Sequence, residues 1–510
     1  MARWGEFKYN SKTKWGATPT HRRLTWGVLI DWSNDGTYSY GNENLHVLEM
    51  NVRRGRESFM QSGGAGFQRR FAGNTRITLR NNDKRYDPFN ISGPLYGKLE
   101  QNQKVKIIVK DESTGTIYPI FFGRIDDIRP NYGVLSTVTL TASDAITSLS
   151  KGVINTSSVS LAVQYDQAVS NLLTAFGWTD AIDIDTSSLD SMSYWWGDGT
   201  SAYNQLCNLT DAVIGNFYVS ADGTATYRPR IVDDTIGLTF TDADVLWEWN
   251  VRSPSPRETI KNRVQVYARA RKSVASATLW TMGDIPYIPA GESRTIWAQF
   301  SYNAENVPAT TITPPAATTD YAMSTVSGGG GTDLTASFTV ATTNFSTTAK
   351  LVVTNGSALG GYVNLLKLRG TVIVSDNYTY SEASDPTSIA NYGERLFTVQ
   401  SDWLQSATYA ISQANTVLGL LDTPRYYPQF MLRGKPSQQF SAELNMLVAI
   451  SLLTIGLGAN MRIGYIEHNV RFAQAGGNIC DTLLYFEPNF SSGTGGTSTV
   501  PVTIPFIAGA

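Results

Sequence analysis

Four segments in the first third of the chain alternate apolar with polar positions. Their apolar residues are Leu48, Met50 and Val52; Ile77 and Leu79; Val105, Ile107 and Val109; and Val138 and Leu140. A period of two places one face of a strand in a core and the other face in water. Turn residues such as Asn81-Asn82-Asp83 separate these runs. We therefore expect a small barrel or sandwich of strands over residues 25–150.

The period changes to that of a helix over residues 151–230. One helical face collects Leu161, Tyr165, Ala168, Val169, Leu172, Leu173 and Phe176, and Gly177 is placed to end that helix. A second helix is expected from an N-cap at Thr200 to Gly215. Asp222-Gly223 then stands between two short strand-like runs, which is the sequence of a hairpin turn. The pattern predicts a compact helix–helix–hairpin domain.

Strand patterns return in the second half of the chain, around a segment rich in Pro, Thr, Ala and Ser. Strands are expected at residues 238–240, 263–268, 350–354, 362–368, 462–472 and 482–486. Gly328 to Gly331 form the centre of the Pro- and Thr-rich segment and predict an exposed loop inside a β domain over residues 276–390. Between residues 405 and 421 a helix is expected, with an inward face of Ala407, Ile411, Ala414, Leu418 and Leu421.

The two ends of the chain have patterns of their own. Trp-Gly recurs at Trp4, Trp15 and Trp26, so residues 1–24 are expected to form an arm that lies on a neighbouring subunit, although a chance cluster of tryptophans explains the repeat equally well. After residue 490 a Ser-, Gly- and Thr-rich run leads to an apolar tail. Residues 491–510 would need another surface on which to pack.

Composition fits a folded protein of several domains. The 510 residues are 42% hydrophobic and 11% aromatic, and the net charge is only −2, which argues against a general binder of nucleic acids or membrane surfaces. The charge is uneven, since residues 1–130 carry 21 Lys and Arg against 13 Asp and Glu. Basic groups such as Arg53-Arg54-Gly55-Arg56 and Arg69-Arg70 are interpreted mainly as solvated surface, with contact to phosphate or to an acidic neighbour left open.

The number of cysteines and the length of the apolar runs exclude two further classes of protein, those held together by disulfides or cysteine-bound zinc and those that span a membrane. With Cys207 and Cys480 alone, the sequence contains neither a disulfide framework nor a cysteine-based zinc site. The first residues lack the apolar stretch of a signal peptide. The longest apolar run, from Met446 to Leu457, is too short to span a bilayer. We expect a protein made in the host cytoplasm and not stably inserted into a membrane.

Carboxylates occur in two suggestive groups. Asp126 and Asp127 are adjacent, so on a strand they point to opposite faces and cannot act on one substrate. Asp180, Asp183 and Asp185 resemble a loose calcium loop, but they lack the Gly and the terminal Glu of an EF-hand. A solvated loop is the favoured interpretation there.

Nucleophile and zinc motifs are also weak. Glu467-His468 lies in a strand pattern rather than in the helical HExxH arrangement of zinc peptidases. Cys207 falls among core positions of the second helix, where a thiol is usually a small hydrophobe. Neither a nucleophile elbow nor a phosphate-binding P-loop occurs. We therefore expect no catalytic residues, no cofactor and no metal site, and a protein that is not an enzyme.

One succession of motifs is more specific. Residues 73–90 read GNTRITLRNNDKRYDPFN and are followed by GPLYGKL at 93–99, VKI at 105–107 and FFGRI at 121–125. This order resembles the minor tail or hub proteins of long-tailed bacteriophages, in which a strand ends in an Asn- and Asp-rich turn before an "RY-P-N" loop. Later segments with counterparts in that family are residues 218–230, 262–266, 362–370, 392–395 and 465–468.

The resemblance implies a mainly β, multidomain fold of the baseplate-hub type, with two tube-type β-barrels and α+β accessory domains. By position, residues 25–150 would form the first barrel, and residues 231–275 together with 391–490 would form the second. Residues 151–230 and 276–390 would be inserts. Many relatives carry a lytic or carbohydrate-binding domain after the hub, and the absence of one here puts digestion of the cell wall in doubt.

The same resemblance implies a virion protein at the distal end of the tail. The chain would form a homotrimer that adapts the six-fold tail tube and the hexameric distal tail protein to a three-fold tip. It would contact the tape measure protein and tail fibres or receptor-binding proteins, and DNA would only pass through its channel during genome ejection. Two alternatives stay open: a receptor-binding tip protein that uses the 276–390 insert, and a tail-associated cell-wall hydrolase.

Overall fold

The predicted first barrel forms a curved sheet in the computed structural model. The model describes residues 24–41, 43–55, 71–133, 136–154, 157–186, 191–229, 235–246, 260–424, 427–472 and 479–489. Six strands lie in the order β1-β4-β5-β6-β3-β2. Their bounds are β1 (Leu24–Ile30), β2 (Val47–Gly55), β3 (Phe71–Arg80), β4 (Lys104–Asp111), β5 (Ile117–Asn131) and β6 (Thr137–Ser143), with a 3-10 helix, η1 (Glu43–His46), before β2. The alternating apolar residues are buried, as predicted, except Leu48, which is only partly buried.

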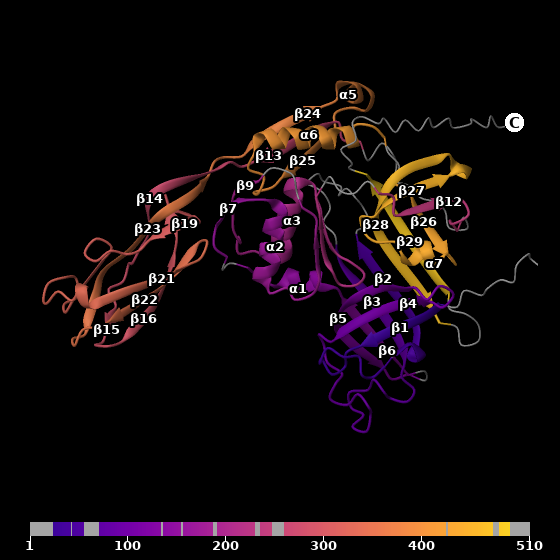
Figure 1. Ribbon diagram of the computed structural model, residues 1–510, viewed down its shortest axis with the longest axis horizontal. Helices are drawn as coiled ribbons and strands as arrows, with labels where there is room; N and C mark the ends of the chain where they lie inside the picture. The colour runs from indigo at the N-terminus through magenta and orange to yellow at the C-terminus, as the bar shows by residue number, and fades with distance from the viewer. Residues whose placement is uncertain are drawn as a thin grey trace, which may run out of the picture.

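The C-terminal strands continue this sheet rather than forming a separate one. They are β12 (Leu238–Thr241), β26 (Gln429–Arg433), β27 (Leu447–Leu452), β28 (Leu457–Arg471) and β29 (Ile479–Pro488), with α7 (Pro436–Phe440) and η3 (Leu453–Ile455) between them. The first half of β28 pairs with β27 and the second half pairs with β2, from Glu49 opposite Arg471 to Gly55 opposite Tyr465. One 11-stranded sheet therefore joins the two ends of the chain, and Figure 1 shows β2 and β28 side by side.

The helix–helix–hairpin unit is present, with shifted boundaries. It contains α1 (Ala145–Lys151), β7 (Ser160–Val163), α2 (Tyr165–Phe176), β8 (Ile182–Ile184), β9 (Met192–Trp195), α3 (Ala202–Val213), β10 (Asn216–Val219) and β11 (Ala225–Arg228). Leu161 lies in β7, which pairs with β9, and not on the first helix. Ser201 caps α3 in place of Thr200, because its hydroxyl accepts from the backbone of Asn204. Gly223 closes the predicted hairpin with a φ of 94°.

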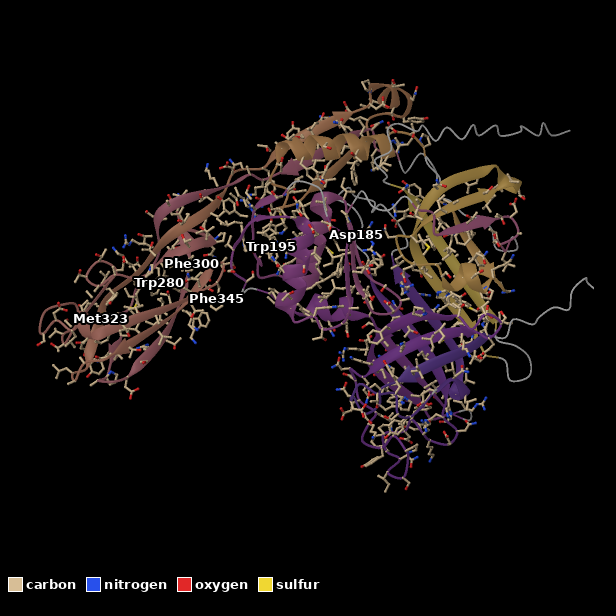
Figure 2. All side chains as sticks on the ribbon, viewed as in Figure 1. Asp185, Trp195, Trp280, Phe300, Met323 and Phe345 are labelled. Carbon is tan, nitrogen blue, oxygen red and sulfur yellow. The ribbon has the colours of Figure 1, made fainter. Side chains whose placement is uncertain are left out.

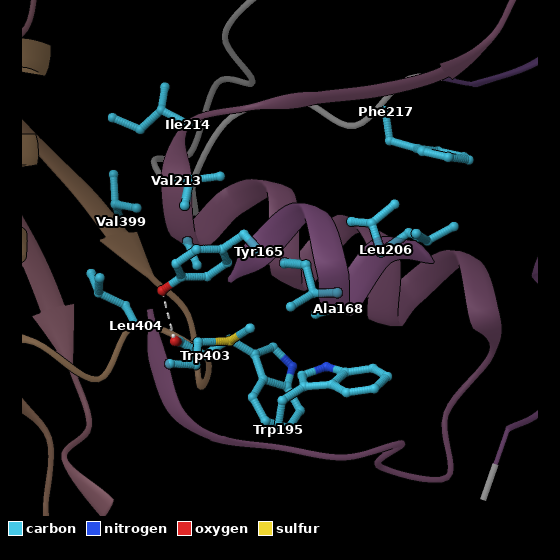
Figure 3. Packing of buried hydrophobic residues seen from close by; sticks show 14 of the residues in the cluster. Tyr165, Ala168, Trp195, Leu206, Val213, Ile214, Phe217, Val399, Trp403 and Leu404 are labelled. Carbon is cyan, nitrogen blue, oxygen red and sulfur yellow. Dashed lines mark hydrogen bonds between the residues drawn. The ribbon is translucent and has the colours of Figure 1, made fainter. Parts of the chain in front are cut away.

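The assignment of residues 263–275 and 391–421 to the second barrel was wrong. In the fold, β13 (Arg263–Ala268) lies between β24 (Thr379–Ser384) and β25 (Leu396–Gln400), with α5 (Pro386–Tyr392) and α6 (Ala407–Leu421) nearby. This sheet shares one core with α2 and α3, where the hydroxyl of Tyr165 donates to the backbone oxygen of Trp403 at 3.0 Å (Figure 3). A strand pattern alone does not name the partners of a strand, and this pairing is with distant residues.

The face of α6 also differs from the prediction. Its buried residues are Tyr409, Ala410, Gln413, Ala414, Val417 and Leu421, whereas Ile411 is exposed. The side-chain amide of Gln413 donates to the backbone oxygen of Ala212 and so allows a polar residue on the inner face. Relative to the prediction, α6 is rotated about its axis, because Gln413 and the aromatic Tyr409 lie on the side that faces the core.

The inserted β domain is an elongated unit that projects from the rest of the chain (Figure 1). Its elements are β14 (Arg271–Thr281), β15 (Tyr287–Ile288), β16 (Ser293–Gln299), β17 (Ser301–Tyr302), β18 (Glu305–Asn306), β19 (Ala309–Thr313), β20 (Tyr321–Ser324), η2 (Thr335–Ser337), β21 (Phe338–Asn344), β22 (Thr348–Asn355) and β23 (Gly361–Ser375). The insert therefore ends near residue 375 and not at 390. Its glycine loop is exposed as predicted, and Gly328 to Gly331 all have positive φ.

The mainly β, multidomain class is confirmed, with the helices gathered in α+β parts. The Trp-Gly arm before residue 24, the tail after 490, and Arg56, Arg69 and Arg70 lie outside the described residues. In the part of the chain that the structure describes, no helix is long and apolar enough to cross a membrane.

Candidate assembly interfaces

The "RY-P-N" motif forms a long loop, residues 81–103, between β3 and β4, and a buried carboxylate holds its base. Glu43 in η1 is almost fully buried. It accepts hydrogen bonds from the indole nitrogen of Trp32 at 2.8 Å and from the hydroxyl of Tyr86 at 2.7 Å. The guanidinium of Arg85 completes the set with contacts of 3.0 and 3.3 Å. We call these four residues the Glu43 cluster.

The electrostatics of the Glu43 cluster favour its closed form. Burial, together with the neighbouring charge of Glu43, raises the pKa of Tyr86 well above its ordinary value, so the phenol stays protonated and continues to donate. Burial acts to lower the pKa of Arg85, but the hydrogen bond and charge of Glu43 outweigh it and raise this pKa. Asn81 also fixes the loop, since its side-chain oxygen accepts from the backbone of Tyr86 at 2.9 Å.

The far side of this rigid loop presents apolar side chains to solvent. Phe89 is 82% exposed and Ile91 is 75% exposed, and Tyr96 on the same loop, Leu45 in η1 and Tyr132 after β5 are exposed as well. Tyr132 donates to Asp87 at 3.1 Å, which ties the end of β5 to the loop. Large exposed apolar residues on an ordered segment are typical of a protein interface. The loop is therefore a candidate docking surface.

The second candidate region is the pairing of β2 with β28, which we call the seam. Asn51 donates to Glu467 at 2.7 Å and to Asn469 at 2.6 Å, and Arg53 pairs with Glu467 at 3.3 Å. These polar contacts accompany the backbone register between the two strands. The seam joins residues that lie more than 400 positions apart in the sequence.

Where the seam ends, three parts of the chain meet at Glu443. One oxygen of its carboxylate accepts from Arg54 of β2 at 2.7 Å, and the other accepts from the backbone of Ala221 in the β10–β11 hairpin at 3.0 Å. Gly55 has a φ of 95°, and a Cβ there would collide with the backbone oxygen of Gly464. Arg54 is thus a buried structural residue and not the exposed basic group suggested by the sequence.

Asp144 supports the same region from the first sheet. Its carboxyl oxygens accept from the backbone of Gly73 at 2.7 Å and of Ile146 at 2.9 Å, which caps α1. Burial raises the pKa of Asp144 to about 7, although these two hydrogen bonds and the positive charge of Arg54 act in the opposite direction.

The insert is fixed to the α+β part by a partly buried arginine. The guanidinium of Arg271, at the start of β14, lies 4.2 Å from the ring centres of both Trp196 and Trp403. It also donates to the backbone oxygen of Asp402 at 2.9 Å. Burial lowers the pKa of Arg271 to about 10, so it remains charged at neutral pH. Two indoles that meet edge to face, with ring centres 5.1 Å apart, and a hydrogen bond define the orientation of β14 at the base of the insert.

The carboxylates singled out in the sequence are engaged in local structure. Asp126 accepts from Ser143 at 2.9 Å, and Asp127 pairs with Arg129. Asp183 and Asp185 both pair with Arg228, which is the role a bound cation would otherwise fill. Within the described ranges, no group of three or more His, Cys, Asp or Glu residues is arranged to hold a metal.

His468 and both cysteines are buried. Burial lowers the pKa of His468 to about 3, so its ring stays neutral, and its Nδ1 lies 2.9 Å from the hydroxyl of Thr482. Burial raises the pKa of the Cys480 thiol to about 12, which makes it a poor nucleophile. Cys207 is buried in α3. The hydroxyl of Thr482 also lies 4.0 Å from Sγ of Cys480, so His468 and Cys480 share one buried neighbour, whereas Cys207 lies in another part of the fold.

The Glu43 cluster and the contacts of Arg271 with Trp196 and Trp403 were not predicted from the sequence. A lone Glu or Arg carries no local signal of burial, and the partners of both lie in other segments. The aromatic partners did give a weak signal, because tryptophan and tyrosine are frequent at half-buried contacts.

Comparison with known proteins finds matches among solved structures only. No family model matches the chain, and no curated protein matches it. Solved structures that do match include tail proteins of prophages. One is the 43 kDa tail protein of prophage MuSo2 from Shewanella oneidensis, with 12% identity, a TM-score of 0.48, and coverage of 91% of this chain and 99% of that one.

Two further structures have similar coverage. A tail protein from Neisseria meningitidis MC58 has 9% identity and a TM-score of 0.49, with 91% of this chain and 96% of that chain covered. An Escherichia coli component of the type VI secretion system, described as structurally similar to T4 bacteriophage tail proteins, has 7% identity and a TM-score of 0.38, with 91% and 76% covered. No residue role is carried over from these matches.

Proposed function

We propose that the chain is a structural protein of the tip of a phage tail and acts as a trimeric hub. It adapts the six-fold tail tube and the distal tail ring to a three-fold tip, and it surrounds the channel for the tape measure protein and DNA. In this role it resides in the virion and performs no catalysis. The ordered motifs between residues 73 and 125 support the proposal.

The observation that carries the proposal is the edge-to-edge joint of β2 and β28. It joins the N-terminal strands and the C-terminal strands of one chain into a single continuous sheet. At the ends of the main strand path, β1 pairs with β4 alone and β12 pairs with β27 alone among the described strands. Unpaired edges favour association with further strands, and a closed ring of identical chains satisfies them.

The projecting loop of residues 81–103 gives such a ring a surface for a neighbour. Phe89 and Ile91 at its tip would be buried when it docks. The Glu43 cluster keeps the loop in one shape, so little conformational entropy is lost on binding. The polar residues considered for chemistry are already engaged in hydrogen bonds and ion pairs of the fold, which supports a structural role.

Light scattering on the purified chain tests the proposal. We expect a particle of about 167 kDa, three times the 55.8 kDa of one chain. Thr25→Lys in β1 and Thr239→Lys in β12 place a charge at exposed positions of the two edge strands and should shift the particle toward the monomer. Thr281→Lys, exposed at the end of β14, is the control and should leave the mass unchanged. A wild-type monomer at micromolar concentration would contradict the proposal.

A receptor-binding role for the insert is the second candidate. It is favoured by the projection of the insert away from the 11-stranded sheet (Figure 1). Deleting residues 276–372 should leave tails assembled and abolish adsorption to host cells. Normal adsorption of such tails would contradict this candidate.

A further inference from the structure

The outer face of the small sheet β16-β22-β21 in the insert has an unusual composition. The side of the sheet formed by Ala298, Ala349, Leu351 and Val353 is buried in the core of the insert. Because side chains alternate along strands, the register assigns to the other face Ser293, Thr295, Trp297, Gln299, Thr339, Ala341, Thr343, Thr348, Lys350, Val352 and Thr354. Most of these residues carry hydroxyl groups, and Val352 is the one large aliphatic residue.

Trp297 is the prominent residue of this face. Its side chain is 60% exposed, and no other tryptophan among the described residues is classed as exposed. The indole stacks on Phe345, with ring centres 5.8 Å apart and an angle of 23° between the planes. The pair forms a flat aromatic platform beside a polar sheet surface.

The platform is held in place by the neighbouring α+β part. Ser346 follows Phe345 and is fully buried, and its backbone nitrogen donates to the backbone oxygen of Ser157 at 2.8 Å. Figure 2 shows Phe345 on the side of the insert that faces the rest of the chain. A platform fixed in this way needs no ordering before it binds a ligand.

Charge on the face has one sign. Lys350 lies in the same cross-strand row as Trp297 and Thr343, and β16, β21 and β22 contain no Asp or Glu. Among the described residues, no carboxylate lies within ion-pair distance of Lys350. An ammonium beside an aromatic platform would complement a carboxylate on a stacked ring.

We propose that this face binds an acidic polysaccharide, with a pyranose ring stacked on Trp297 and its carboxylate paired with Lys350. The negative face of the indole attracts the partly positive C–H groups on one side of a sugar ring. Thr295, Thr343 and Gln299 supply donors and acceptors for sugar hydroxyls. Three adjacent strands about 4.8 Å apart give an open strip suited to an extended polymer rather than a pocket for a small molecule.

A protein partner is less suited to this surface. Protein interfaces are rich in aromatic residues and methionine at their centre and poor in serine, whereas this face has one exposed aromatic residue among many hydroxyl groups. The inference goes beyond the hub function, because it concerns the insert alone and does not depend on how copies of the chain assemble.

Affinity electrophoresis of the full chain tests the proposal. Gels contain polygalacturonate, alginate or hyaluronate as acidic pyranose polymers, dextran as a neutral polymer, or polyglutamate as an acidic polymer without sugar. We expect retardation by at least one acidic polysaccharide, weaker retardation by dextran and none by polyglutamate. Failure of all three acidic polysaccharides to retard the protein would overturn the proposal, as would equal retardation by polyglutamate.

Matched variants locate the site. Trp297→Ala should weaken binding by about tenfold or more, and Lys350→Met should remove the preference for acidic over neutral polymer. Tyr380→Ala and Lys106→Met remove an exposed aromatic ring in β24 and a positive charge in β4, and both should bind as the wild type does. Near-ultraviolet circular dichroism checks that each variant is folded. Unchanged binding by folded Trp297→Ala would also overturn the proposal.

Discussion

Replacing Glu43 with alanine should release the docking loop of residues 81–103 while leaving the rest of the fold intact. The carboxylate is the shared acceptor for Trp32, Arg85 and Tyr86. Its removal leaves the buried indole N–H and the phenol O–H without an acceptor, and each such unsatisfied donor costs about 1–3 kcal/mol of folding free energy. Arg85 is partly exposed, so water can replace its lost partner. We expect a total cost of about 2–6 kcal/mol.

Glu43→Gln should cost about half as much, because the amide keeps its shape and the hydroxyl of Tyr86 can rotate to accept from the amide nitrogen. Arg85 then lacks a charged partner, so some opening is still expected. The comparison of the two variants separates the loss of acceptors from the loss of charge.

Hydrogen–deuterium exchange with mass spectrometry reads out the opening of the loop. A local cost of about 4 kcal/mol corresponds to exchange about a thousandfold faster in peptides that cover residues 81–103. Glu49→Ala is the control, because Glu49 is exposed and makes only a 3.3 Å contact with Thr78. Unchanged exchange in Glu43→Ala, or an equal increase in Glu49→Ala, would refute the reasoning.

Three further predictions concern the junctions. In Asp144→Asn, a carboxyl whose pKa is about 7 when folded, against an ordinary 3.8, is replaced by a neutral amide. Protonation of Asp144 stabilises the wild type in acid, and this contribution is lost as the pH rises toward 7. The wild-type free energy of unfolding should therefore fall relative to the variant by about 1.4 kcal/mol per pH unit between pH 4 and 7; parallel pH profiles in urea unfolding would contradict this. Arg271→Ala removes the cation that contacts both Trp196 and Trp403 and should cost about 2–4 kcal/mol. The loss is measured as faster proteolysis at the base of the insert, and unchanged cleavage would show that these contacts do not hold the insert. Gly55→Ala forces a Cβ into the seam at positive φ and should lower the unfolding free energy by at least about 2 kcal/mol, and an unchanged melting temperature would count against a tight seam.

Much of the local structure could be predicted from the sequence. Strands such as β4 and β6 were predicted from the alternation of apolar and polar residues, because each strand has one buried face and one less buried face. The Asp222-Gly223 turn was predictable for a different reason, since its conformation requires a residue that adopts positive φ. These features depend on neighbours in the sequence.

Features that depend on distant neighbours could not be predicted. The residues of β13 form a strand in either domain, and only the fold shows that it pairs with β24 and β25. The face of α6 turned because a buried Gln413 finds an acceptor on α3, which no periodicity reveals. Glu43 has the sequence context of an ordinary surface residue, and its three partners come from segments up to 43 positions away.

Averaged electron-microscope images of the purified chain test the central claim most directly. We expect rings of three-fold symmetry with a central channel, in which the 11-stranded sheet of each chain contributes one third of the wall. The inserts should extend outward from the ring at three positions. Single particles without symmetry, or rings of two-fold symmetry, would contradict the account.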